Sequence, residues 1–163
     1  MKVYGVTGWK NSGKTGLMER LVVEIITRGL SVSTVKHAHH NFDVDQPGKD
    51  SHRHRHAGAK EVLLCSSKRF TLMHEIRDAD EPSLTSLLDM LSPVDLVLIE
   101  GYKRDFHPKI EAYRKETGQK LSALNDPTIE AVAANQIIKI DKPVFDLDDT
   151  VGIANFILAQ TGF

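Results

Sequence analysis

Apolar and polar residues follow one another along the chain with two spacings, one typical of strands and the other of helices. Residues 3–6 form a short apolar run of the kind that becomes a buried strand. A helical face follows, made up of Leu17, Leu21, Val22, Ile25 and Ile26. Gly29 ends this pattern, because glycine commonly closes a helix. The chain is therefore predicted to open with a strand, a loop and a helix.

The same spacings predict further elements. Strands are expected at residues 31–36, 61–65, 69–76, 94–99, 109–114, 129–134 and 143–147. Helices are expected at residues 51–57, 83–91 and 149–160. The last helix is expected to begin with a cap at Asp148 or Asp149. Its predicted buried face consists of Val151, Ala154, Ile157 and Leu158.

The surroundings of some strands can also be predicted. Residues 94–99 are the most apolar, which favours a central strand parallel to the first one. Residues 109–114 alternate between apolar and polar, which predicts an exposed strand. Residues 61–65 and 69–76 are close enough in sequence to pair as an antiparallel hairpin. Strands alternating with helices predict an α/β fold: a mainly parallel sheet covered on both faces, with an antiparallel hairpin portion.

Composition narrows the class of protein. The chain has 163 residues, which favours a single domain over residues 1–163, and 40% of them are hydrophobic. A net charge of −1 argues against a general nucleic-acid or membrane-surface binder, and no stretch is apolar enough to span a bilayer. Cys65 is alone, so it cannot form an internal disulfide, and it is expected in the core. No apolar signal region precedes the first strand, so a cytoplasmic location is expected.

A phosphate-binding loop (P-loop) joins the first strand to the first helix. Residues 8–15 match the pattern G-x-x-x-x-G-K-[ST] at every fixed position. The residues expected to hold a nucleoside triphosphate are Gly8, Lys10, Asn11, Ser12, Gly13, Lys14, Thr15 and Gly16. Lys14 would reach the β and γ phosphates, and Thr15 would ligate Mg²⁺. The fold class then becomes a P-loop NTPase three-layer α/β fold.

Two acidic residues are further candidates for the magnesium site. Ligands of open α/β sheets bind beyond the carboxyl ends of the strands. Glu100 follows the most apolar strand, so it could hold Mg²⁺ directly or through water. Asp45 stands in an Asp-x-x-Gly sequence after the second strand, in the form by which nucleotide switches sense a γ phosphate.

The segment after the second strand is rich in histidines and cations. Lys49, Arg53 and Arg55 are predicted to face an anion, with a solvated helix face as the alternative. Six histidines between residues 37 and 56 make a Zn²⁺ or Ni²⁺ site a second hypothesis. Against a metal site, His52 and His56 share a helix face while His54 points elsewhere.

Two absences bear on function. The Asn-Lys-x-Asp sequence that reads guanine does not occur, so the residues leave the base undecided. No glutamine or arginine can be identified from spacing as the residue that positions an attacking water, which argues against fast hydrolysis.

These segments together resemble the molybdopterin-guanine dinucleotide biosynthesis protein B family (MobB) over nearly the whole chain. The resemblance rests on four stretches: residues 8–15, residues 36–45, residues 47–58 and residues 98–110. The second and third contain Lys36-His37-Ala38-His39-His40 and Pro47-Gly48-Lys49-Asp50-Ser51, and the fourth contains Ile99-Glu100-Gly101-Tyr102-Lys103.

The resemblance implies a GTP-binding accessory protein of molybdenum cofactor maturation. It would bind GTP with Mg²⁺, hydrolyse it weakly at most, dimerise through its antiparallel portion and assist the guanylyltransferase that joins GMP to molybdopterin. Glu100 and Asp45 would serve the magnesium, and Lys49, Arg53 and Arg55 would face a phosphate of the nucleotide or of molybdopterin. Two alternatives stay open: a metallochaperone GTPase for nickel or zinc, and a small-molecule kinase.

Overall fold

The computed structural model of the chain describes residues 1–38 and 42–163. They form two compact units, Met1–His37 with Leu88–Phe163, called the sheet unit below, and Ala38–Leu87, called the hairpin unit. The single domain expected from chain length stays a prediction. No helix within the described residues is both long enough and apolar enough to cross a membrane.

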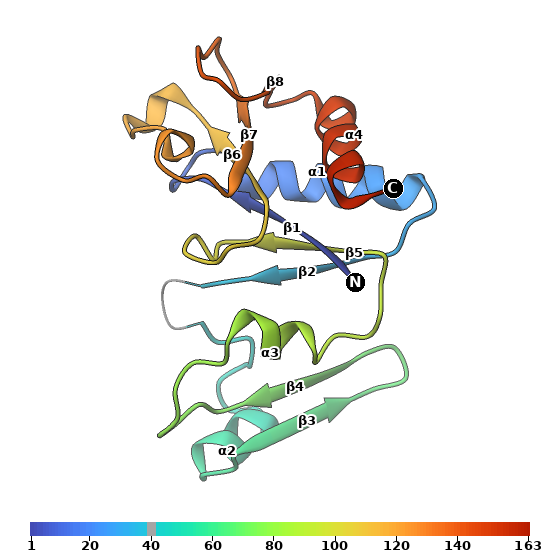
Figure 1. The fold of residues 1–163 in the computed structure, drawn as a ribbon. Coiled ribbons are helices and arrows are strands. Elements are labelled where there is room, and N and C mark those ends of the chain that lie inside the picture. Colours follow the sequence, from blue (N-terminus) through green and yellow to red (C-terminus); the bar gives the residue numbers. More distant parts are fainter. Residues whose placement is uncertain (39–41) are drawn as a thin grey trace. The chain divides into compact units, whose positions relative to one another are not determined.

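The sheet unit is built on a parallel sheet that has six strands in the described residues (Figure 1). They are β1 (Lys2–Thr7), β2 (Val32–Lys36), β5 (Leu96–Glu100), β6 (Lys109–Tyr113), β7 (Ile129–Ala134) and β8 (Val144–Asp146). Their order across the sheet is β2-β5-β1-β6-β7-β8, and each neighbouring pair is parallel. The carboxyl ends of all these strands therefore lie at one edge, which is where such sheets bind ligands.

Two helices pack on one face of this sheet, α1 (Lys14–Thr27) and α4 (Thr150–Thr161). The core beneath them contains Tyr4, Leu21 and Ile157, each fully buried. Asp149 caps α4 by accepting a hydrogen bond from the backbone N–H of Gly152 at 2.9 Å, as predicted. Two predicted core positions are wrong: Ile26 and Val151 are exposed. Both lie at the edge of their helical stripe.

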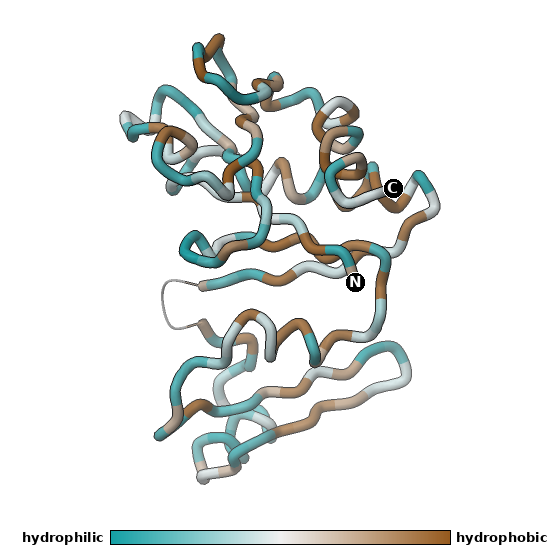
Figure 2. The backbone as a smooth tube through the Cα atoms, viewed as in Figure 1, coloured by the Kyte–Doolittle hydropathy of each residue, from teal (hydrophilic) through white to brown (hydrophobic). Residues whose placement is uncertain are grey.

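The opposite face of the sheet holds a smaller core beside the short 3₁₀ helix η2 (Ser122–Leu124). Leu121 and Ala123 pack there against Ile129 and Val132 of β7. A second short 3₁₀ helix, η1 (Lys115–Thr117), has no buried residue. Figure 2 shows apolar residues running along the strands of this unit. The fold class predicted from the sequence, α/β with a mainly parallel sheet and an antiparallel hairpin portion, is confirmed.

The prediction that residues 109–114 form an exposed strand is wrong. β6 lies between β1 and β7, and both Lys109 and Glu111 are completely buried. The Lys109 ammonium donates to the carbonyl of His107 at 3.0 Å and to Thr128 Oγ1 at 2.7 Å. The Glu111 carboxylate accepts the backbone N–H groups of Ser122 and Ala123. These partners allow a polar strand to lie in the interior, because buried charges are tolerated when they are hydrogen-bonded.

The hairpin unit contains α2 (Asp50–His56), β3 (Glu61–Cys65), β4 (Phe70–His74) and most of α3 (Leu84–Leu88). β3 and β4 pair antiparallel, as predicted, but they form a separate two-stranded sheet and not an extension of the main one. The expected core position of Cys65 is wrong, because this residue is exposed at the end of β3. Helix α3 is also shorter than the predicted residues 83–91.

Candidate functional site

The loop between β1 and α1 is held in a conformation that requires glycine. Gly8, Asn11 and Gly13 all have positive φ, of 142°, 65° and 93°. A Cβ atom on Gly8 would lie 2.3 Å from the carbonyl oxygen of Ala112. Helix α1 begins directly after this loop, at Lys14, so its first N–H groups are available to an anion. The local sequence thus builds the glycine-dependent loop and helix start that the octet predicts.

A cavity of about 370 Å³ lies at this loop. It is lined by Asn11, Ser12, Gly13, Lys14, Thr15, Gly16 and Arg114. The structure therefore brings together most of the residues predicted to hold phosphate. Arg114, which sequence reasoning missed, comes from the end of β6, and its guanidinium lies against Gly13. The rule that ligands bind beyond strand ends would have identified it, had residues 109–114 been recognised as a central strand.

The ammonium of Lys14 folds back onto the loop and donates to the Trp9 carbonyl at 2.7 Å. The pKa of Lys14 is lowered, mainly because the ammonium is partly buried. The Glu100 carboxylate raises that pKa, and the charges of Lys103 and Lys36 lower it. Three lysines thus gather where a phosphate chain would lie, and a bound anion would relieve their mutual repulsion.

Ser12 offers a second sign that the loop is built for a ligand. Its side chain is almost completely buried, and its hydroxyl finds no hydrogen-bond partner among the described residues. A buried hydroxyl without a partner is unfavourable by about 1–3 kcal/mol. A phosphate oxygen in the loop would accept this hydrogen bond.

The two predicted magnesium ligands of the sheet unit meet in one groove. Thr15 and Glu100 both line a cavity of about 470 Å³ between α1 and β2. Glu100 is mostly buried and pairs with Lys36 at 3.4 Å, its register partner on β2. A hydroxyl and a carboxylate are oxygen donors of the kind that Mg²⁺ prefers, so these residues fit that ion.

Asp45 and Arg55 instead belong to an ion network inside the hairpin unit. Arg55 pairs with Asp45 at 3.2 Å, with Asp43 at 2.8 Å and with Glu75 at 2.9 Å. Ser51 Oγ also donates to Asp45 at 2.8 Å. The hydrogen bonds that Arg55 donates to the Asp43 and Glu75 carboxylates raise the pKa of Arg55 above its ordinary value. All three guanidinium nitrogens meet carboxylates, which favours a structural role for Arg55 over contact with phosphate.

The other residues of this unit that were predicted to bind an anion, Lys49 and Arg53, are exposed to solvent. Lys49 is exposed, and the Arg53 side chain is 74% exposed with only a loose pair to Asp50 at 3.9 Å. His52 and His56 stack with ring centroids 3.9 Å apart, which confirms the shared helix face. Magnesium ligation by Asp45 and phosphate contact by Lys49 and Arg53 stay predictions.

The alternative transition-metal site gains no support from the residues that can be placed. His37 packs on Tyr102 with ring centroids 4.7 Å apart. His39 and His40 lie outside the described residues. Within residues 1–38 and 42–163, no three His, Cys, Asp or Glu side chains come together as metal ligands.

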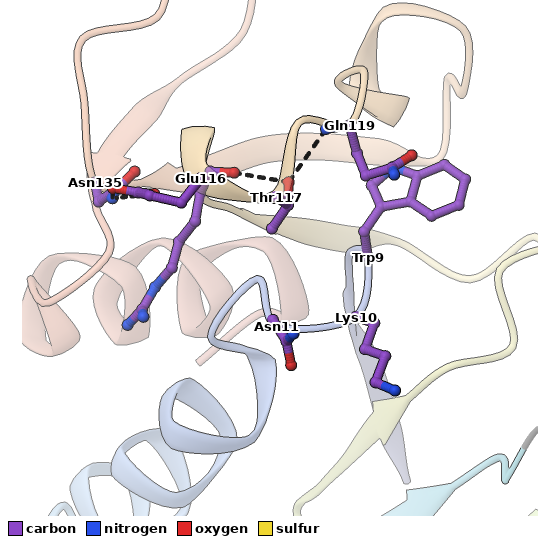
Figure 3. A pocket seen from close by; sticks show the side chains of 8 residues that line it. Trp9, Lys10, Asn11, Glu116, Thr117, Gln119 and Asn135 are labelled. Carbon is purple, nitrogen blue, oxygen red and sulfur yellow. Dashed lines mark hydrogen bonds between the residues drawn. The ribbon is translucent and has the colours of Figure 1, made fainter.

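A third and larger cavity, of about 650 Å³, opens beside the loop (Figure 3). Its lining consists of Trp9, Lys10, Asn11, Arg114, Glu116, Thr117, Gln119 and Asn135. Asn11 and Arg114 line both this cavity and the one at the loop. Lys10, predicted to hold nucleotide, therefore lies in the neighbouring cavity. Glu116 and Asn135 were not predicted, because no local motif marks them.

The chain is similar to proteins of molybdenum cofactor assembly. A family model described as molybdopterin guanine dinucleotide synthesis protein B matches residues 3–135. A molybdopterin-guanine dinucleotide biosynthesis adapter protein of Haemophilus influenzae is 40% identical over 159 residues, covering 94% of this chain and 85% of the relative. The adapter protein of Escherichia coli is 36% identical over 153 residues, covering 92% and 87%. The crystal structure of Bacillus subtilis MobB has a TM-score of 0.78 at 28% identity and covers 99% of this chain and 98% of that one.

Proposed function

The chain belongs to the molybdopterin-guanine dinucleotide biosynthesis protein B family, and we propose that it is an accessory protein that holds GTP and Mg²⁺ for molybdopterin guanine dinucleotide synthesis. Its curated relatives are named adapter proteins of that pathway. The proposed partner is the guanylyltransferase that joins GMP to molybdopterin, with molybdopterin itself as a second candidate. A cytoplasmic location follows from this partner.

The observation that carries the proposal is a cationic loop with a buried hydroxyl that has no hydrogen-bond partner among the described residues. A buried Ser12 hydroxyl without a described partner and a Lys14 ammonium resting on the loop carbonyl of Trp9 both fit a bound phosphate. Arg114 adds a guanidinium at the same cavity. We assign the triphosphate to these residues and to the loop amides, and the magnesium to Thr15 and Glu100. Bound magnesium would neutralise charge on the phosphates.

The composition of the loop cavity supports holding over rapid hydrolysis. Among the described residues that line it, none carries a carboxylate, and none is glutamine. Those are the side chains that orient an attacking water in fast GTPases and kinases. We therefore expect weak hydrolysis at most, with the nucleotide kept for the chemistry of a partner enzyme.

We further propose that the protein is a homodimer that associates through the hairpin. Alternate residues of an antiparallel pair point to opposite faces. Val62 and Met73 are buried on one face, whereas Leu63, Phe70 and Leu72 are 64%, 73% and 54% exposed on the other. Exposed apolar side chains gathered on regular strands are typical of a protein interface.

Replacement of Lys14 tests the nucleotide site directly. Lys14→Ala removes charge-assisted hydrogen bonds to two phosphates, so GTP affinity measured by calorimetry should fall by about 100-fold or more. Lys68→Ala, which removes the same charge from the exposed hairpin turn, is the matched control and should bind GTP like the unchanged chain. Undiminished binding by Lys14→Ala would contradict the loop assignment.

A further inference from the structure

The cavity beside the loop lies where a nucleotide bound at the loop would place its base. The loop follows β1, and the cavity is lined by residues that follow β6 and β7, the next two strands across the sheet. Asn11 and Arg114 belong to both cavities, so the two spaces adjoin. On the other side of the loop, the Lys36–Glu100 pair and Thr15 occupy the strand ends. A base bound with its phosphates at the loop would therefore point toward β6 and β7.

Several residues of this cavity are held in place by hydrogen bonds to their neighbours. The Asn135 amide donates to both oxygens of the Glu116 carboxylate, at 3.0 and 2.9 Å. The Asn135 side-chain oxygen accepts the backbone N–H of Lys115 at 3.4 Å, and Thr117 Oγ1 donates to the Arg114 carbonyl at 2.8 Å. Figure 3 shows Glu116 and Asn135 together at one end of the cavity. The short 3₁₀ turn therefore presents its carboxylate in one orientation.

The opposite end of the cavity is closed by Trp9 and Gln119 (Figure 3). The Trp9 indole N–H donates to the Lys120 carbonyl at 3.0 Å, and the Lys103 ammonium lies 4.5 Å from the indole ring centroid. The ring is thereby held as a flat wall. A volume of about 650 Å³ lies within the range of small-molecule sites, which run to about 1,000 Å³.

The Glu116 carboxylate keeps its negative charge and spare acceptor capacity. A backbone N–H and the Asn135 amide both lower its pKa below the ordinary value. An ionised carboxylate offers about four acceptor positions on its two oxygens, and Asn135 uses one on each. Because one Asn135 nitrogen bridges both oxygens, it occupies the two parallel acceptor positions of the carboxylate, and a ligand edge with two adjacent N–H donors fits the same positions in its place.

We propose that Glu116, held at the cavity by Asn135, reads the guanine base of a bound nucleotide by accepting hydrogen bonds from its N1–H and 2-amino groups in place of the Asn135 amide. Adenine presents an acceptor at N1 and lacks the 2-amino group, so the same carboxylate repels it. This inference rests on the proposed GTP function and deepens it, because it supplies a residue for guanine selectivity in a chain without an Asn-Lys-x-Asp sequence.

The test compares nucleotide affinities of the full chain with those of Glu116→Gln by calorimetry with Mg²⁺. The glutamine amide can donate to the 2-carbonyl of xanthine and no longer accepts two guanine donors. We expect GTP affinity to fall by about 10- to 100-fold, because two hydrogen bonds to a charged acceptor are lost. ATP affinity should stay unchanged or rise, and XTP should become the preferred nucleotide.

Glu24→Gln is the matched control, since it removes the same charge from the outer part of α1 and should keep the GTP preference. A Glu116→Gln protein that prefers GTP over ATP and XTP as strongly as the unchanged chain would overturn the guanine assignment. That result would leave the nucleotide function intact as long as Lys14→Ala still weakens GTP binding by about 100-fold or more. Failure of the unchanged chain to bind any nucleotide would overturn both.

Discussion

In the sheet unit the exposed functional groups are cationic and amide side chains around a loop with positive φ angles, whereas in the hairpin unit the exposed groups are apolar and lie on regular strands. Lys14 and Arg114 line an open cavity next to Gly8 and Gly13. Phe70 and Leu72 stand on a strand with ordinary antiparallel register. A polar, strained and concave surface suits a small anionic ligand, and a flat apolar surface suits another protein.

The two units also differ in how far their charges are satisfied. Arg55 of the hairpin unit meets three carboxylates, so its charge stabilises the unit itself. Within the described residues, no ion pair joins Lys14 or Arg114 to a carboxylate, and Glu100 is paired with Lys36. We infer that nucleotide binding and association with a second protein are separable properties of this chain, and substitutions can test this separation.

Gly8→Ala should have the largest effect. The new Cβ would lie 2.3 Å from the Ala112 carbonyl oxygen at a φ of 142°, so neither the side chain nor the backbone can be accommodated. We expect unfolding free energy to fall by about 3 kcal/mol or more, with loss of GTP binding. Denaturant unfolding followed by circular dichroism measures the first, and calorimetry measures the second.

The hairpin unit supplies the matched control for this substitution. Gly48 also has a positive φ, of 84°, but a Cβ there would meet nothing within 4 Å. Gly48→Ala should therefore cost only about 1 kcal/mol, the ordinary penalty of the left-handed conformation. Equal destabilisation by the two variants would show that the loop is not shaped by its close backbone contact.

The second prediction concerns the exposed face of the hairpin. Leu72→Lys places a charge among Leu63, Phe70 and Cys65, and should weaken dimerisation by about 2 kcal/mol per substituted side chain. Light scattering over a dilution series measures the dissociation constant. Thr71→Lys changes the neighbouring residue on the other face and should leave the dimer intact. Equal dimer dissociation constants for the two variants would show that the exposed face of the hairpin is not the dimer interface.

Much of the loop site could be predicted from the sequence, because its residues are consecutive. The octet fixes the backbone, the lysine and the hydroxyl of Thr15 within eight positions. Glu100 could be predicted from its place at the end of an apolar strand. Arg114, Glu116 and Asn135 could not be found in this way, since only the strand order brings them beside a loop that is about a hundred residues earlier in the chain.

The wrong prediction of an exposed strand and the unexpected pairing of Arg55 have a common physical cause. Lys109 and Glu111 look solvent-exposed because their partners, Thr128 and the amides of residues 122 and 123, come later in the chain. Arg55 was predicted to face an anion because its neighbours in sequence are cations. The sequence does not show that Glu75, which lies later in the chain, pairs with it. Sequence patterns report the polarity of a residue, whereas burial depends on whether tertiary structure supplies a partner.

The smallest predicted effect is a dependence of stability on pH that originates in the sheet unit. His107 packs against Gly5 of β1, and its ring nitrogens are buried with no hydrogen-bond partner among the described residues. Burial, with a smaller contribution from the charge of Lys109, lowers the pKa of His107 to about 4, although Asp105 and Asp126 raise it slightly. The unfolded chain has a histidine pKa of about 6.5 and so binds the proton more readily.

Because the folded state binds this proton less readily than the unfolded state, stability should fall as pH decreases from about 6.5 to about 4. Full linkage would give about 3 kcal/mol, but His107 as a residue is only half-buried, so we expect about 1–2 kcal/mol. His107→Phe fills a similar volume without a titrating group and should lose this part of the pH dependence. Urea unfolding at pH 4.5 and pH 7.5 measures the change in unfolding free energy between these pH values for both proteins. An equal change in the unchanged chain and in His107→Phe would exclude His107 as its source.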